Sequence, residues 1–252
     1  MAMKAMYSVF LMVAAVALLA ISVPAHASDM DDRIELAAKK SYVFKTYLKD
    51  DDIKIQSRNG VVTLTGMVSE EYHKSLAQET LAGMPGVKSV DNRLEIKGAP
   101  PTANSDAWLR DKVKVTLLFH RSVSAGTTEV DVKDGIVILR GDAASLAQKD
   151  LTTAYVRDVE GVKDVNNEMT VTTTSKKTTV GEKIDDASIT AQVKMTLLFH
   201  RSTSALNTKV ETKRGVVTLY GKAGNAAEKD LASKLANDVN GVKGVKNRMT
   251  IE

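Results

Sequence analysis

A unit of roughly 65 residues occurs three times in this chain, and this internal repeat constrains the fold more than any other feature. The second and third copies are related by a fixed offset of 80 positions, and the first copy aligns with the second at an offset of 75. The matched positions are Gly60, Gly66, Gly86 and Asn92 in the first copy, Asp106, Gly135, Gly141, Gly161 and Asn167 in the second, and Asp186, Gly215, Gly221, Gly241 and Asn247 in the third. We therefore expect an array of small domains, with function on a repeated surface and not in one buried catalytic centre.

The amino-terminal segment has the pattern of a secretory signal peptide, which we assign to residues 1–27. Lys4 is its only charge, residues 9–21 form an apolar run, and Ala25 and Ala27 provide the small residues of a cleavage site before Ser28. The thirteen apolar residues fall short of the roughly 20 that span a bilayer, so a membrane anchor is the less favoured alternative.

The chain contains no cysteine. A bacterial lipoprotein needs a cysteine directly after the cleaved signal, so the sequence excludes this kind of lipid anchor. Disulfide bonds and thiolate-bound metals are excluded for the same reason. We therefore expect a soluble protein outside the cytoplasm, periplasmic in a Gram-negative bacterium, and not a lipoprotein.

Each copy begins with the pattern of an amphipathic helix. In the second copy Leu109, Val113 and Leu117 recur at positions i, i+4 and i+8, which places them on one face of the helix. Asp106 and its equivalent Asp186 are suited to the N-cap or to the first turn of this helix.

A hairpin, a second helix and a third strand complete the pattern. Asp134-Gly135 separates two apolar runs, and such a pair favours a tight turn because both central residues need a positive φ. A second helical pattern ends at Gly161, and an alternating strand follows it. The order predicts an α+β fold of three tandem αββαβ modules, each a three-stranded sheet packed under two helices.

Composition sets the domain boundaries. Residues 97–105 are rich in proline and polar residues, and residues 172–183 are rich in threonine and lysine without apolar periodicity. Both compositions favour flexible linkers. We therefore expect modules at residues 28–98, 106–171 and 184–252, joined by linkers at 99–105 and 172–183.

Net charge is distributed unevenly along the chain. The total is +4, with −1 in residues 29–100, 0 in residues 101–180 and +4 in residues 181–252, and Lys4 supplies the remaining charge. The third segment is therefore the part best suited to an acidic partner. A solvated surface without a partner accounts for this charge equally well.

The residues favour neither a catalytic centre nor a metal site. His120 and His200 are equivalent positions in a shared Leu-Leu-Phe-His-Arg-Ser string near a helix end, where a cation stabilises the negative end of the helix dipole. Asp50, Asp51 and Asp52 lack the spaced ligands and the glycine of a calcium loop. Aromatic residues make up only 4% of the chain, which argues against nucleic-acid binding. We expect no enzyme activity, no cofactor, no metal and no small-molecule substrate.

The best candidate binding surface is a second apolar stripe on the first helix of the second copy. At 100° per residue, Trp108, Val115 and Phe119 fall within about 40° of one another, with Lys112 beside the tryptophan. A tryptophan among cations suits the interface of a bilayer, and packing against a neighbouring copy is the alternative. The candidate lipid-binding residues are Trp108, Lys112, Val115 and Phe119 and, in the third copy, Lys194, Met195 and Phe199.

The repeated string G-V-x-x-V-x-N, preceded by G-x-V-x-L-x-G, resembles the BON domain family. In the second copy these residues are Gly161, Val162, Val165 and Asn167, preceded by Gly135, Val137, Leu139 and Gly141. The match covers all three copies, and this repetition makes a short pattern specific. With its cleavable signal, the chain resembles the osmotically inducible periplasmic proteins of this family. These have two such domains as a rule, so the third copy is a departure.

The resemblance implies a role in envelope stress, with phospholipid binding or a chaperone-like activity. We therefore expect a non-enzymatic periplasmic protein of osmotic stress whose modules bind anionic phospholipid membrane surfaces weakly and multivalently. The alternative is a periplasmic chaperone or adaptor that binds secreted or outer-membrane polypeptides. Such a protein would use exposed apolar stripes and sheet edges.

Overall fold

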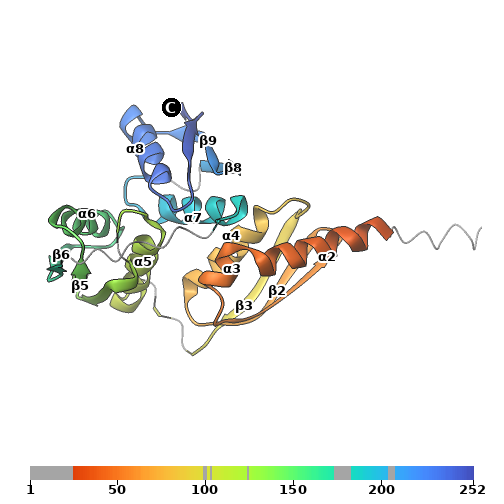
Figure 1. Ribbon diagram of the computed structural model, residues 1–252, viewed down its shortest axis with the longest axis horizontal. Coiled ribbons are helices and arrows are strands. Elements are labelled where there is room, and N and C mark those ends of the chain that lie inside the picture. The colour runs from red at the N-terminus through yellow and green to blue at the C-terminus, as the bar shows by residue number, and fades with distance from the viewer. Residues whose placement is uncertain (1–24, 99–100, 103, 124, 173–182, 204–207) are drawn as a thin grey trace, which may run out of the picture.

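The computed structural model of the chain describes residues 25–98, 101–102, 104–123, 125–172, 183–203 and 208–252 (Figure 1). The expected signal peptide therefore lies outside the described residues, except for its last three positions, which open helix α2 (Ala25–Lys40). Within the described ranges no helix has both the length and the apolar character needed to cross a membrane.

The first module has a divided first helix. Helix α2 is followed by the short helix α3 (Tyr42–Thr46), and Ser41 between them has an extended backbone and accepts a hydrogen bond from the N–H of Phe44 as the N-cap of α3. The single first helix expected for every copy is therefore found only in the other two modules. The remaining elements of the first module are β1 (Asp52–Arg58), β2 (Val61–Val68), α4 (Glu71–Ala82) and β3 (Ser89–Ile96).

The second and third modules repeat one another element by element. The second contains α5 (Asp106–Phe119), η2 (Ala125–Thr127), β4 (Thr128–Lys133), β5 (Ile136–Ala143), α6 (Leu146–Arg157), β6 (Asp164–Asn167) and β7 (Thr170–Val171). The third contains α7 (Asp186–Phe199), β8 (Thr208–Lys213), β9 (Val216–Ala223), α8 (Ala226–Asn237), β10 (Gly244–Asn247) and β11 (Thr250–Ile251).

All three sheets have the same connectivity. The first two strands form an antiparallel hairpin, and the last strand lies parallel to the second, which is therefore central. In the second and third modules the last strand is divided into two short pieces that pair with the same central strand. The predicted α+β fold of three tandem αββαβ modules is confirmed, because each sheet buries one face under its helices.

A carboxylate from the first helix fixes the hairpin turn in each module. In the second module Asp134 and Gly135 have φ values of 55° and 80°, as the predicted tight turn requires. Their backbone N–H groups donate to the two carboxylate oxygens of Asp106 at 2.7 and 2.9 Å. The equivalent carboxylates are Asp31, which binds Asn59 and Gly60, and Asp186, which binds Arg214 and Gly215.

The sequence suited Asp106 and Asp186 either to the N-cap or to the first turn of the helix, and the structure shows the second of these positions. Asp106 and Asp186 lie in the first turns of α5 and α7, but they are not the N-caps. The N-caps are Ser105 and Asp185, whose side chains accept hydrogen bonds from the N–H groups of Trp108 and Ser188. The second and third modules therefore use one side chain to begin the first helix and the next one to tie that helix to the hairpin.

The asparagine of the repeated string joins the last strand to the second helix. The Asn167 amide donates to the carbonyl oxygen of Lys149 at 3.0 Å and to the hydroxyl of Thr153 at 2.8 Å, and its oxygen accepts from the N–H of Met169 at 3.0 Å. Asn92 and Asn247 make equivalent contacts in the other modules. This part of the motif is therefore structural.

Helix α7 lies at the centre of the molecule, in contact with all three modules (Figure 1). Ten of its fourteen residues are buried, and they cover its whole circumference, as expected for a helix enclosed on every side. Ala187 and Ala191 allow α4 of the first module to approach closely, and a Cβ on Gly83 would lie only 3.5 Å from the Cα of Ala187. The three modules are thus packed around one shared helix.

Candidate functional site

The second apolar stripe lies at the junction of the modules and not on a free surface. Val115 and Phe119 are fully buried and Met195 is 1% exposed, and all three belong to the core of the first module. The ring centroid of Phe119 lies 5.5 Å from that of Tyr47. Because Trp108 is half-buried and Phe119 is enclosed, the two are not exposed together. The centre of the stripe packs against a neighbouring copy, which was the alternative to lipid contact.

The cation beside Trp108 is also held inside the protein. The ammonium group of Lys112 donates to the carbonyl oxygen of Glu160 at 3.1 Å. It lies 4.3 Å from the centroid of the Trp108 ring and 5.6 Å from that of the half-buried Phe199 ring, distances suited to cation–π attraction. Burial lowers the pKa of Lys112, although the Glu160 carboxylate opposes this shift. Lys112 therefore joins two modules and does not face solvent.

The Leu-Leu-Phe-His-Arg-Ser string forms a reciprocal clamp between the second and third modules. His120 forms an antiparallel bridge with Val239 of the third module, and the N–H of Arg121 donates to the carbonyl oxygen of Asp238 at 3.0 Å. The string of the third module makes the same contacts with the second. The equivalent pairs are His200 with Val159 and Arg201 with Asp158.

The arginine of each clamp closes the end of a helix in the other module. The Arg121 guanidinium donates to the carbonyl oxygens of Asn237, Val239 and Val242, the first of which is the last residue of α8. Arg201 does the same at the end of α6. A cation is favourable at a helix C-terminus, as the sequence suggested, but the helix belongs to the neighbouring module.

The histidine of the first clamp, His120, belongs to a hydrogen-bonded network that crosses to the third module. The Nδ1 atom of His120 lies 3.0 Å from a carboxylate oxygen of Asp238, and its ring stacks on Tyr155 at a centroid distance of 3.9 Å. The Tyr155 hydroxyl donates to the same carboxylate at 2.5 Å. Burial raises the pKa of Asp238, but hydrogen bonds from His120, Ser122 and Tyr155 outweigh it and hold this pKa below its ordinary value. The network fastens two modules together.

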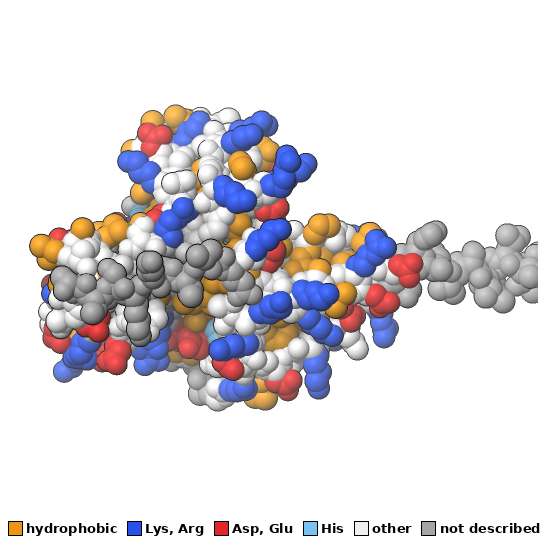
Figure 2. Space-filling model, in the orientation of Figure 1, with side chains coloured by type: hydrophobic (Ala, Val, Ile, Leu, Met, Phe, Trp, Pro, Cys, Tyr) orange, Lys and Arg blue, Asp and Glu red, His pale blue; other side chains and the backbone are white. Residues whose placement is uncertain are grey.

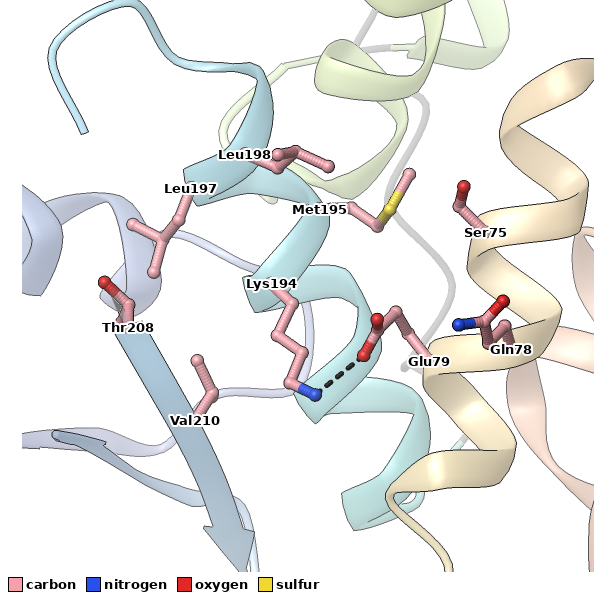
Figure 3. Close-up of a pocket in the computed structure, with 9 residues that line it drawn as sticks. All are labelled: Ser75, Gln78, Glu79, Lys194, Met195, Leu197, Leu198, Thr208 and Val210. Carbon is pink, nitrogen blue, oxygen red and sulfur yellow. Dashed lines mark hydrogen bonds and ion pairs between the residues drawn. The ribbon is translucent and has the colours of Figure 1, made fainter. Parts of the chain in front are cut away.

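A groove of about 250 Å³ separates the first module from the third (Figure 3). The ammonium group of Lys194 crosses it to the Glu79 carboxylate at 2.7 Å. The α7 and β8 side is mainly apolar and includes Leu198, which is 43% exposed, whereas the α4 side is polar. The lining residues are Ser75, Gln78 and Glu79 on α4, Lys194, Met195, Leu197 and Leu198 on α7, and Thr208 and Val210 on β8. This arrangement can hold an amphipathic chain.

The outer face of the second module's sheet is acidic. Val137 and Leu139 of β5 are buried toward the helices, so the residues that alternate with them along the strands face outward. This face and its hairpin turn have six exposed acidic residues and two exposed basic residues, which gives a net charge of −4. This acidic face comprises Glu129, Asp131, Asp134, Asp142, Asp164 and Glu168, with Lys133 and Arg140.

The same positions of the third module form a basic face. This face has six exposed bases and two exposed acids, a net charge of +4, and Figure 2 shows lysine and arginine side chains gathered over this module. The basic face comprises Lys209, Lys213, Arg214, Lys222, Lys246 and Arg248, with Glu211 and Glu252. The outward strand positions of the first module have no net charge, since Lys54, Arg58 and Arg93 are balanced by Asp52, Asp91 and Glu95.

Local ion pairs neutralise only part of each face. Arg140 binds Asp131 at 2.8 Å and Glu168 at 3.0 Å on the acidic face. On the basic face Lys209 binds Glu211 at 2.7 Å, and Lys222 lies 3.4 Å from the carboxylate of Glu252. Within the described residues, the salt bridges of the structure do not include Lys213, Arg214, Lys246 or Arg248.

The sequence indicated which segment is basic but not which residues form the surface. The charge excess of residues 181–252 pointed to the third module. A comparison of the outward strand positions at the offset of 80 would have revealed the reversal from acid to base, for example from Glu129 to Lys209 and from Asp142 to Lys222. The groove could not be predicted from the sequence, because it depends on how two modules pack against each other.

Comparisons with known proteins agree with the repeat. The BON domain matches residues 30–98, 105–173 and 185–252. The chain is 32% identical to the osmotically-inducible protein Y of Escherichia coli K12 over 55% of this chain and 71% of that protein. It is 33% identical to the outer membrane lipoprotein DolP of Haemophilus influenzae over 44% of this chain and 56% of that protein.

A similarity to a solved structure is weaker. The C-terminal domain of CdsD, a structural protein of the type III secretion system of Chlamydia trachomatis, covers 83% of this chain and 95% of its own length at 15% identity. The TM-score is 0.24, a value at which the likeness supports no argument about fold or function.

Proposed function

Because the chain belongs to the BON domain family, we propose that it is a non-enzymatic protein of the cell envelope that acts in osmotic stress and binds anionic phospholipid surfaces through the basic face of its third module. The names of its relatives support this setting, since one is osmotically inducible and another is an outer membrane lipoprotein. A periplasmic location with a cleaved signal peptide is part of the proposal.

The observation that carries the lipid proposal is the net charge of +4 on one exposed sheet face. Each lysine or arginine near an anionic membrane contributes about 1 kcal/mol. Four net charges are then worth about 4 kcal/mol, which corresponds to a dissociation constant on the order of 1 mM. Binding through this face is therefore weak, and salt screens it because the charges are exposed.

The proposal moves the lipid contact away from the Trp108 stripe. Val115, Phe119 and Met195 are buried between modules, so they reach a bilayer only if the modules separate. The basic face is open without any such change. It also belongs to one module, so the expected multivalent binding by all modules is replaced by binding through the third.

Liposome co-sedimentation tests this assignment. A basic-face variant carries Lys209→Glu, Lys222→Asp and Arg248→Glu, which are the residues of the second module at these positions. We expect the unmodified protein to sediment with phosphatidylglycerol-rich vesicles at low salt and the basic-face variant to remain in the supernatant.

The matched control reverses three bases at outward positions of the first module. The changes Lys54→Glu, Arg58→Glu and Arg93→Glu alter the net charge of the protein by the same amount. We expect this control to retain most of the binding. Equal loss in both variants would show that total charge, and not the basic face, governs sedimentation.

The groove supports a second candidate function, a chaperone or adaptor for secreted polypeptides. An apolar wall beside the edge strand β8, which pairs only with β9 among the described strands, suits an extended segment with apolar side chains. Leu198→Asp should then weaken suppression of the aggregation of an unfolded outer-membrane protein in the absence of lipid. Leu146→Asp is the control, because Leu146 is 63% exposed and lies on α6 outside the groove. Equal activity of both variants would exclude the groove.

A further inference from the structure

The opposite charges of the two sheet faces indicate a second copy of this chain as a partner. We propose that the acidic face of the second module binds the basic face of the third module of another copy. This contact goes beyond lipid binding and does not depend on it, since it requires both faces.

The two faces lie on sheets of the same topology and register. The reversals from Glu129 to Lys209 and from Asp142 to Lys222 occupy equivalent positions of equivalent strands. The net charges of −4 and +4 are equal in size and opposite in sign. Two sheets of the same shape can therefore oppose rows of acids to rows of bases, and such complementarity selects a partner and speeds association.

The contact must form between chains. The clamp joins the second and third modules through their helices, with His120 on Val239 and His200 on Val159. Helices α5 and α6 cover the inner face of the second module's sheet, and helices α7 and α8 cover that of the third, so both outer faces point away from the clamped helices. The acidic face thus has no access to the basic face of its own chain while the clamp is closed.

The expected association is weak and sensitive to salt. Exposed ion pairs contribute about 0–1 kcal/mol each, and at physiological salt their attraction is screened over about 8 Å. The contact joins two different surfaces, so a pair of chains retains one free acidic and one free basic face. Such a contact either extends into a chain of molecules or closes into a ring.

Sedimentation velocity of the purified protein tests the proposal. In about 20 mM salt, where the screening length exceeds 20 Å, we expect the weight-average mass to rise at least twofold with protein concentration. In about 500 mM salt we expect a monomer, because screening removes the attraction between exposed charges. A monomer at every concentration in low salt would overturn the proposal.

Two variants separate the faces. The basic-face variant described above keeps only the acidic face, and an acidic-face variant with Glu129→Lys, Asp142→Lys and Glu168→Arg keeps only the basic face. Each substitution introduces the residue that the homologous module carries at an exposed position, so the fold should be retained. We expect each variant alone to be monomeric and an equimolar mixture to form a one-to-one complex in low salt.

The mixture is the decisive measurement. If the mixed variants do not associate, or if either variant alone associates as the unmodified protein does, the pairing of these faces is wrong. Vesicle binding is measured on the same samples. An acidic-face variant that sediments with vesicles but does not self-associate supports both proposals, whereas one that self-associates and ignores vesicles contradicts both independently.

Discussion

Helices α5 and α7 occupy equivalent positions in their modules, yet one is partly solvated and the other is enclosed. In both helices, residues at equivalent positions bind the hairpin, fill the module core and lead into the clamp. On the remaining face Arg110, Asp111 and Lys112 of α5 are replaced by Thr190, Ala191 and Gln192 in α7.

This difference shows how a repeated helix can be adapted to a central position. The first module covers α7, and a charged side chain there would lose its hydration. The small side chains of Ala187 and Ala191 instead allow α4 to pack closely. The residues for the hairpin and the core are retained in both helices, because every module needs them.

The largest expected effect comes from giving α7 the charge that α5 carries. Ala191 is fully buried against the first module, so Ala191→Asp places a carboxylate there without a cation to pair with. We expect a loss of about 3–5 kcal/mol in the free energy of unfolding, as for an uncompensated buried charge. Urea unfolding followed by circular dichroism measures it.

The reverse substitution is the control. Asp111 lies beside Arg110, whose Nε is 3.4 Å from its carboxylate, and we expect Asp111→Ala to change the free energy of unfolding by less than about 1 kcal/mol. Similar losses in Ala191→Asp and Asp111→Ala would show that the two helices do not differ in the way described.

A smaller effect, of the same size in the second and third modules, is expected at the hairpin carboxylates. Asp106→Asn and Asp186→Asn each remove the charge from an acceptor of two backbone N–H groups. Hydrogen bonds to charged groups contribute about 1.5–3 kcal/mol, and we expect losses of this order that agree between the two variants. A clear inequality in urea unfolding would mean that the modules do not share this support.

The smallest expected effect is a pH dependence at the clamp. Burial lowers the pKa of His200 below its ordinary value of 6.5; Asp158 opposes this shift, whereas Arg201 and His120 add to it. The folded protein then binds a proton less readily than the unfolded chain. His200 therefore contributes stability above pH 6.5, and this contribution is lost as the pH falls below that value toward the pKa of the folded state.

The measurement compares urea midpoints at about pH 7.5 and pH 5.5, where histidine titrates. We expect a lower midpoint at the acidic pH and a smaller difference in His200→Asn. His120→Asn should lower both midpoints, because it removes the bond to Asp238. An unchanged pH difference in His200→Asn would contradict the assignment.

The module fold could be predicted because its signals are local. Asp134-Gly135 specifies a turn with positive φ, and Leu109, Val113 and Leu117 specify a buried helix face, whatever surrounds the module. Because the pattern recurs in three copies, a chance occurrence of these signals could be excluded.

The arrangement of the modules could not be predicted in the same way. An apolar stripe containing Val115 and Phe119 has the same spacing whether it meets lipid or another module, since both remove it from water. The divided helix at Ser41 and the clamp of Arg121 on α8 likewise depend on contacts between distant segments. The charged faces were accessible to sequence reasoning, but only once outward and inward strand positions were known.

The reciprocal clamp has a consequence for how such a protein can grow. Two modules that each place the end of their first helix on the other module have the symmetry of a homodimer, here within one chain. A closed pair of this kind saturates both of its surfaces, so a fourth unit could not be added through it. Any extension of the array must use a different contact, as the first module does by resting on the side of α7.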